Sequence, residues 1–267
     1  MLRSAAVIGN YDYMVDWRFQ ENGSITVGVA ATGIVETTSV DRGPSKEPAM
    51  AEMAEYGHLV DKGIEAINHD HFFSFRFDID VDGPKNSFIV DRLVPQQLPP
   101  GQSRKSIWVM KSSIAPSETE AISDLDIHHP AMWRFINPAH PGPVGYPSSI
   151  EIMPGQTGVS LLSPDDWPQK RAGFSAHTLW VTPYQPTERY AVGTYPTGSK
   201  GADGLHIWTK ADRKIEDTDI VAWYTMGFHH VPRAEDWPVM PVMWHEFEIH
   251  PYDFFAHNPL MNRSMQP

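Results

Sequence analysis

The sequence predicts an all-β fold, an antiparallel β-sandwich with long loops, and three observations support this prediction. Several runs alternate apolar and polar residues with a period of two, which is the pattern of a half-buried strand. The chain of 267 residues contains 24 prolines, which break helices and are common in turns and at strand edges. Turn-forming pairs such as Asn22-Gly23 and Asp82-Gly83 separate the runs.

Four segments carry the strand pattern. They are residues 24–29, 73–81, 177–181 and 221–226. The second is the clearest, because every other residue from Phe73 to Val81 is apolar and the residues between them are polar. Strict alternation places one face of such a strand against a core and the other face in water.

The best helical candidate is the segment of residues 47–67, although Gly57 and Gly63 weaken it because glycine is a poor helix former. No internal repeat or low-complexity block divides the sequence. We therefore expect one large domain over residues 1–267, which is long enough to bury a substantial core.

Composition excludes several classes of function. Charged residues are 20% and hydrophobic residues 41% of the chain, as in ordinary soluble globular proteins. The formal net charge of −12 makes nucleic acid an unsuitable partner, because its phosphate backbone repels an acidic surface. No stretch of about 18 apolar residues exists, so we expect no membrane span.

The absence of cysteine excludes disulfides, thiolate nucleophiles and cysteine metal sites. Any metal ion must therefore be held by histidine, aspartate or glutamate. A chain without cysteine fits a reducing compartment, and the N-terminal residues do not resemble a secretory signal. The location is open, with the cytoplasm or a peroxisome-like compartment favoured.

His69 and His71 form the first candidate metal site. Residues two apart on a strand point to the same side, so both imidazoles can reach one metal ion. The aromatic residues that follow, beginning with Phe73, share this parity, and the pair should therefore face the interior. Buried imidazoles suit a transition metal such as copper or zinc. Two hydrogen-bonded histidines at a strand end are the simpler interpretation.

Asp78 and Asp80 form the second candidate, on the opposite face of the same strand. With the carbonyl group of Ile79 between them, two carboxylates suit a hard cation such as calcium. Asp217 and Asp219 form another acidic pair, just before residues 221–226. A solvated strand face explains these carboxylates about equally well.

The segment Asn10-Tyr11-Asp12-Tyr13 resembles the signature of the copper amine oxidases, in which the first tyrosine is converted to topaquinone. Further segments are similar to this family in the same order, and the resemblance is weakest at residues 95–171. The similar segments are residues 7–9, 16–19, 23–34, 68–72, 75–83, 179–184, 217–224, 227–233, 235–241, 251–255 and 258–259.

The resemblance implies a Cu(II) site and a quinone cofactor. The copper ligands would be His69, His71 and His230, and topaquinone would form from Tyr11, flanked by Asn10 and Asp12. A second, non-catalytic site would hold Ca(II) or Mn(II). Its implied ligands are the side chains of Asp78, Asp80 and Asp219 with the carbonyl groups of Ile79 and Ile220.

The resemblance also implies a homodimer that converts a primary amine and dioxygen to an aldehyde, ammonia and hydrogen peroxide. Only ten residues precede Tyr11, whereas the family's catalytic base lies well upstream of the quinone. We therefore expect the C-terminal part of a catalytic domain without its upstream domains. A general base typically contributes ~10²–10⁴-fold, so the chain alone should be weakly active or inactive.

Three hypotheses remain open from the sequence. The first is an amine oxidase catalytic region that is competent when complete. The second is a copper-binding β-domain without turnover. The third is an unrelated β-protein with a histidine metal site, such as a cupin-like dioxygenase, which would need a further glutamate or histidine at a spacing that the sequence lacks.

Overall fold

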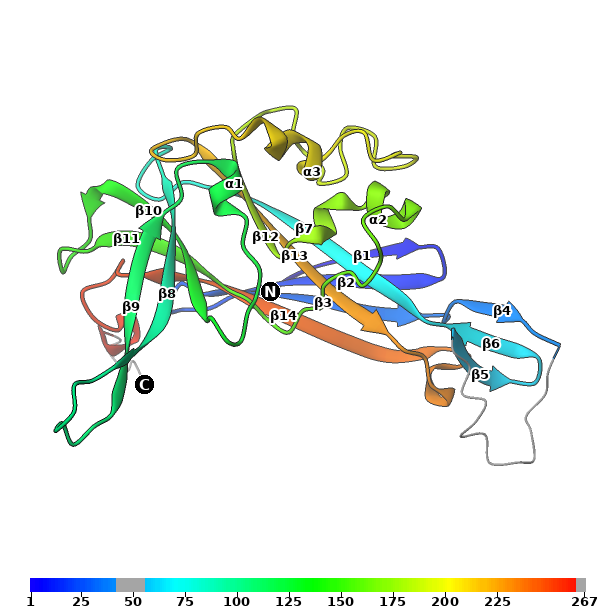
Figure 1. Cartoon of the computed structure of the whole chain (residues 1–267). Coiled ribbons are helices and arrows are strands. Elements are labelled where there is room, and N and C mark those ends of the chain that lie inside the picture. The colour runs from blue at the N-terminus through cyan, green and yellow to red at the C-terminus, as the bar shows by residue number, and fades with distance from the viewer. Residues whose placement is uncertain (42–55, 263–267) are drawn as a thin grey trace.

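A computed structural model describes residues 1–41 and 56–262, and these residues form mainly antiparallel β-sheets (Figure 1). The larger sheet has eight strands, with β1 at one edge and β9 at the other. Its order is β1 (Leu2–Ile8), β2 (Tyr11–Phe19), β3 (Ile25–Gly33), β14 (Met240–Tyr252), β11 (Pro147–Met153), β10 (Ala131–Pro141), β8 (Ser87–Gln97) and β9 (Ser106–Ile114).

Two smaller sheets complete the β-structure of the described residues. One has the order β12 (Leu179–Pro183), β13 (Ile220–His230) and β7 (His69–Ile79). The other has the order β4 (Thr37–Ser39), β6 (Ile64–Ile67) and β5 (Gly57–Asp61). The helices are short: α1 (Glu118–Ala121), α2 (Trp167–Arg171), η2 (Gly173–Ala176), α3 (Leu205–Trp208), η3 (Thr209–Ala211), η4 (Ala234–Asp236) and η5 (Pro259–Asn262).

The main core lies between the eight-stranded sheet and the sheet of β12, β13 and β7. Phe247 of β14 lies at its centre, with its ring centroid 5.0 Å from that of Phe75 on β7 and 4.4 Å from that of Tyr224 on β13. Trp17 of β2 packs edge-on against Phe75 and Phe77. Side chains from two facing sheets thus interdigitate, as in other sandwiches, and the predicted fold class is confirmed.

A second cluster covers the other face of β12 and β13. Trp180 and Trp223 project there and pack against Leu205 of α3 and Phe174 of η2. The short helices therefore shield the outer face of the three-stranded sheet, which leaves only its inner face for the sandwich core. No helix in the described part of the chain is long and apolar enough to cross a membrane.

All four strand predictions are confirmed, with longer bounds for three of them: β3, β7 and β13. The helix predicted over residues 47–67 begins outside the described residues, and its second half is wrong. That half forms the β5–β6 hairpin, whose turn contains Gly63 at φ +69°. Glycine reaches this conformation without steric cost, so the residue that weakens a helix here reverses the chain instead.

Candidate metal centre

Two neighbouring strands bring His69, His71 and His230 together at one end of the sandwich. In the antiparallel ladder of β7 and β13, His230 lies directly opposite His69. His71 follows two residues later and faces the same side, as strand periodicity requires. One ligand atom from each ring lies within 4.8 Å of the others, and this is the one such group among the described residues.

Hydrogen bonds decide which nitrogen His69 presents. Its Nδ1 lies 2.6 Å from the carbonyl oxygen of Ile67. A carbonyl oxygen only accepts, so Nδ1 carries the hydrogen and donates it. The lone pair of the ring is therefore on Nε2, which is the nitrogen that faces the other two histidines.

The same reasoning assigns His230. Its Nε2 lies 3.2 Å from the Oδ2 atom of Asp236, which leaves the lone pair on Nδ1. This Nδ1 lies 3.3 Å from Nε2 of His69. Two nitrogens that both present lone pairs cannot form a hydrogen bond with each other, whereas both can bind one cation. Such outer hydrogen bonds are typical of histidine metal ligands.

His71 presents a buried nitrogen with no hydrogen-bond partner among the described residues. Its Nδ1 lies 2.8 Å from the phenol oxygen of Tyr13, and its Nε2 is the unpartnered atom. Burial, followed by the charges of His69, His230 and His245, lowers the pKa of His71 to about 3. The ring is therefore neutral at neutral pH, which is the form that binds metal ions. A buried nitrogen without a partner beside two nitrogens that present lone pairs fits a set of three metal ligands.

Tyr11 reaches this cluster from β2, on the opposite sheet. Its phenol oxygen lies 2.7 Å from Nε2 of His69 and accepts a hydrogen bond from the backbone N–H of Glu36 at 3.1 Å. Because Nε2 carries a lone pair, the phenol donates its hydrogen to it. Burial is the main reason that the pKa of Tyr11 is raised, and the side chain is only 5% exposed. The phenol is therefore neutral in the absence of a cation.

Asn10 and Asp12 lie on either side of Tyr11 but have exposed positions. Asn10 is in the turn between β1 and β2, where its carbonyl oxygen accepts a hydrogen bond from Ile34. Asp12 is exposed on β2, one residue from Tyr11, and so faces the opposite side of the sheet. A role of these two residues around a cofactor stays a prediction.

Sequence reasoning missed Tyr13 and Asp236 as partners of the histidines. The position of Tyr13 could have been predicted, because Tyr13 stands two residues after Tyr11 and must share its face of β2. The sequence could not predict the role of Asp236, because only the short η4 helix brings its carboxylate back to His230. The backbone N–H of Arg233 also donates to this carboxylate at 3.1 Å and helps to fix it.

The predicted second metal site is more exposed to solvent than the histidine cluster. Ile79 and Ile220 are directly opposite in the ladder, and Asp78 and Asp80 are exposed beside Ile79. Burial raises the pKa of Asp219, and the charges of Asp78 and Asp80 raise it further. Among the described residues these three carboxylates do not form a group as close as the three histidines. The Oδ1 atom of Asp219 is buried without a hydrogen-bond partner among the described residues, which fits the role of a cation ligand.

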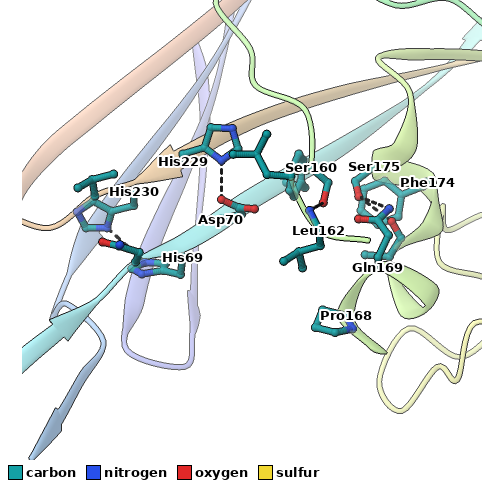
Figure 2. Close-up of a pocket in the computed structure, with 15 residues that line it drawn as sticks. His69, Asp70, Ser160, Leu162, Pro168, Gln169, Phe174, Ser175, His229 and His230 are labelled. Atoms are coloured by element: carbon teal, nitrogen blue, oxygen red, sulfur yellow. Dashed lines mark hydrogen bonds and ion pairs between the residues drawn. The ribbon is translucent and has the colours of Figure 1, made fainter. Parts of the chain in front are cut away.

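A groove of about 690 Å³ lies beside the histidine cluster (Figure 2). Asp70 and His229 project into it from the face of β7 and β13 opposite to His69, His71 and His230, and Nδ1 of His229 donates a hydrogen bond of 2.6 Å to Oδ1 of Asp70. His69 and His230 reach its edge. The apolar part of the wall consists of Phe72, Leu161, Leu162, Pro168, Ala172, Phe174 and Val231.

Comparisons with known proteins agree on one family. The family model described as "Copper amine oxidase, enzyme domain" matches residues 1–267. The chain is 41% identical to the copper-containing amine oxidase gamma 1 of Arabidopsis thaliana, over 97% of this chain and 36% of that protein. It is 40% identical to the copper-containing amine oxidase alpha 2, peroxisomal, of the same plant, over 97% of this chain and 38% of that protein.

Among solved structures, the copper-containing benzylamine oxidase from Hansenula polymorpha superposes with a TM-score of 0.87 at 29% identity. The superposition covers 98% of this chain and 40% of that one. The chain therefore spans well under half the length of the proteins that it matches.

Proposed function

We propose that this chain, which belongs to the copper amine oxidase family, is the copper- and quinone-bearing part of a primary amine oxidase. In the complete reaction a primary amine, dioxygen and water become an aldehyde, ammonia and hydrogen peroxide. The whole reaction is part of the proposal, because the chain corresponds to only 36–40% of the length of the similar proteins named above.

One observation carries the proposal: a buried phenol donates a hydrogen bond to one of three converging imidazoles. His69 would hold copper through Nε2, His71 through Nε2 and His230 through Nδ1. When bound there, Cu(II) supplies a redox-active Lewis acid beside the phenol of Tyr11. Tyr11 would then be the precursor of topaquinone.

The residues around Tyr11 support this chemistry by holding the ring beside the three imidazoles. The backbone N–H of Glu36 holds the phenol oxygen at the cluster. Val35, Ala66 and Met240 are buried against the ring. A phenol held in this way lies at a defined place beside the three imidazoles, where a bound Cu(II) ion would act on the ring of Tyr11.

The second metal site is part of the same proposal. Ca(II) or Mn(II) would bind through the carboxylates of Asp78, Asp80 and Asp219 and the carbonyl oxygens of Ile79 and Ile220. Oxygen ligands of this kind suit hard cations. The buried, unpartnered Oδ1 atom of Asp219 supports the assignment.

Partner and location are proposals as well. We infer a homodimer from the family, with a primary amine and dioxygen as substrates. A cytoplasmic or peroxisome-like location is favoured, and the similar Arabidopsis protein whose name includes "peroxisomal" supports it.

The experiment loads the metal-free chain with Cu(II) in air, denatures it and applies a redox-cycling quinone stain. The unmodified chain should stain, and Tyr11→Phe should not. Tyr146→Phe is the matched control, because Tyr146 is an exposed surface tyrosine, 66% accessible, and this variant should stain normally. An unstained wild-type chain, or a stained Tyr11→Phe variant, overturns the proposal.

Turnover needs a second readout, namely hydrogen peroxide released on addition of a primary amine. Peroxide that depends on the amine, on copper and on Tyr11 supports an oxidase. A chain that stains but releases no peroxide is a copper- and quinone-bearing domain without turnover by itself, which is the outcome that the sequence predicts for this chain alone.

A further inference from the structure

We propose that Tyr13 is a positioning residue of the metal centre: its phenol oxygen accepts the Nδ1 hydrogen of His71 and so leaves the lone pair on Nε2 for the metal ion. The proposal rests on the proposed function, because it concerns the same three histidines. It adds a residue whose side chain touches a ligand and not the metal ion itself.

The position of Tyr13 follows from strand geometry. Tyr13 stands two residues after Tyr11 on β2, and both rings point into the sandwich, where their centroids are 6.0 Å apart at an interplanar angle of 28°. The phenol oxygen of Tyr13 is 2.8 Å from Nδ1 of His71. The neighbouring tyrosines thus contact neighbouring histidines: Tyr11 contacts His69, and Tyr13 contacts His71.

The direction of this hydrogen bond must be inferred, because a hydroxyl group can both donate and accept. If Tyr13 donated, the hydrogen of neutral His71 would be on Nε2. That nitrogen is buried with no acceptor among the described residues. An orphaned buried N–H is rare in native proteins, whereas an unpaired acceptor is tolerated somewhat more often. The geometry therefore assigns the hydrogen to Nδ1 and the role of acceptor to Tyr13.

The hydrogen-bond partners of His69 and His230 can only accept, so the tautomers of these two rings are fixed. The carbonyl oxygen of Ile67 fixes His69, and the carboxylate of Asp236 fixes His230; neither group can donate. His71 is therefore the ligand whose tautomer can change most readily. Removal of the Tyr13 hydroxyl frees His71 to place its hydrogen on either nitrogen, and only one of the two forms binds metal through Nε2.

The test compares the intact chain with Tyr13→Phe, which keeps the ring and removes only the hydroxyl group. Tyr224→Phe is the control, because Tyr224 is a fully buried tyrosine of the main core whose ring packs on Phe247. Long-range ¹H–¹⁵N spectra of the metal-free, ¹⁵N-histidine-labelled chains report the tautomer of His71. We expect Nδ1–H in the intact chain and in Tyr224→Phe, and a mixture of both forms in Tyr13→Phe.

Copper binding gives the second readout. Competition with a chelator should show affinity for Cu(II) weakened by about 10–100-fold in Tyr13→Phe, the usual effect of losing a hydrogen bond to a metal ligand. Affinity in Tyr224→Phe should be unchanged. Electron paramagnetic resonance should show three coupled nitrogens in the intact chain and a heterogeneous signal in Tyr13→Phe.

The outcomes separate this inference from the proposed function. If the intact chain binds no Cu(II) through three nitrogens, the proposed function fails. If the intact chain does bind Cu(II) through three nitrogens, two results would overturn the role of Tyr13. One is that His71 carries its hydrogen on Nε2, and the other is that Tyr13→Phe binds Cu(II) as tightly as the intact chain. The spectrum of the intact chain tests the tautomer even if Tyr13→Phe does not fold.

Discussion

The phenol oxygen of Tyr11 lies 2.7 Å from Nε2 of His69, although the two residues are 58 positions apart in the chain. Tyr11 belongs to the eight-stranded sheet and His69 to the three-stranded sheet, so the contact exists only when the sandwich is closed. The histidine cluster and its contact with Tyr11 therefore form together with the main core.

Loss of one ligand should remove copper binding, and loss of the neighbouring histidine should not. His69→Ala deletes a nitrogen of the cluster, so affinity for Cu(II) should fall by more than the roughly 10–100-fold that an outer hydrogen bond contributes. His229→Ala is the control, because this ring pairs with Asp70 on the opposite face of the sheet. Equal copper loss in both variants, measured by calorimetry, would contradict the ligand assignment.

Removal of the aromatic side chain at the centre of the core between the sheets should destabilise the fold strongly. Phe247 is 3% exposed and contacts aromatic rings of β7 and β13, so Phe247→Ala should lower the free energy of unfolding by about 3–5 kcal/mol. Trp108→Ala is the control, because Trp108 on the edge strand β9 is 68% exposed and should change the value by about 0.5 kcal/mol or less. Chemical denaturation measures both, and similar losses would disprove this packing.

Asp124 should contribute stability that disappears in acid. Burial alone would raise its pKa, but hydrogen bonds from His177 and the backbone of Thr178 outweigh burial and lower the pKa below its usual value of 3.8. Because the pKa is lower in the folded state, the contribution is complete at pH above about 4 and is lost as the pH falls through the folded-state value.

We therefore expect Asp124→Asn to lower the free energy of unfolding at pH 7 and to lower it less near pH 2. The side chain is 45% exposed, so solvent screening keeps the difference within about 1 kcal/mol. Urea unfolding at the two pH values measures it. A loss that persists unchanged in acid would show that the ionised carboxylate is not responsible.

Calcium should stabilise the chain through the carboxylates near Ile79. Binding to the folded state alone stabilises by about 2.7 kcal/mol at a ligand concentration of 100 times Kd, so the Tm should rise with added Ca²⁺. Asp219→Asn should abolish this rise, whereas Asp165→Asn, on a side chain that is 95% exposed, should keep it. A Tm that does not respond to Ca²⁺ or Mn²⁺ in the intact chain would rule out the second site.

Local periodicity was sufficient to predict the strands and one half of the site. The alternation after His71 placed the aromatic residues and the two histidines on one face of β7, and that face is the inner one. Tyr11 and His230 could not be placed in this way. Their approach depends on the pairing of β13 with β7 and on the closure of two sheets, which are contacts between distant parts of the chain.

The hairpin of β5 and β6 shows where local reasoning was misleading. The residues around Gly63 do not exclude a helix, and only the pairing of Gly57–Asp61 with Ile64–Ile67 decides the structure. The tautomers of the histidines were also beyond the sequence, because they depend on acceptors such as Ile67 and Asp236 that only the fold brings near.

Anomalous diffraction at the copper edge from crystals of the Cu(II)-loaded chain tests the metal centre most directly. We predict one strong peak within bonding distance of Nε2 of His69, Nε2 of His71 and Nδ1 of His230, next to the ring of residue 11. A peak bound elsewhere, or no peak among these three rings, would contradict the proposed copper site.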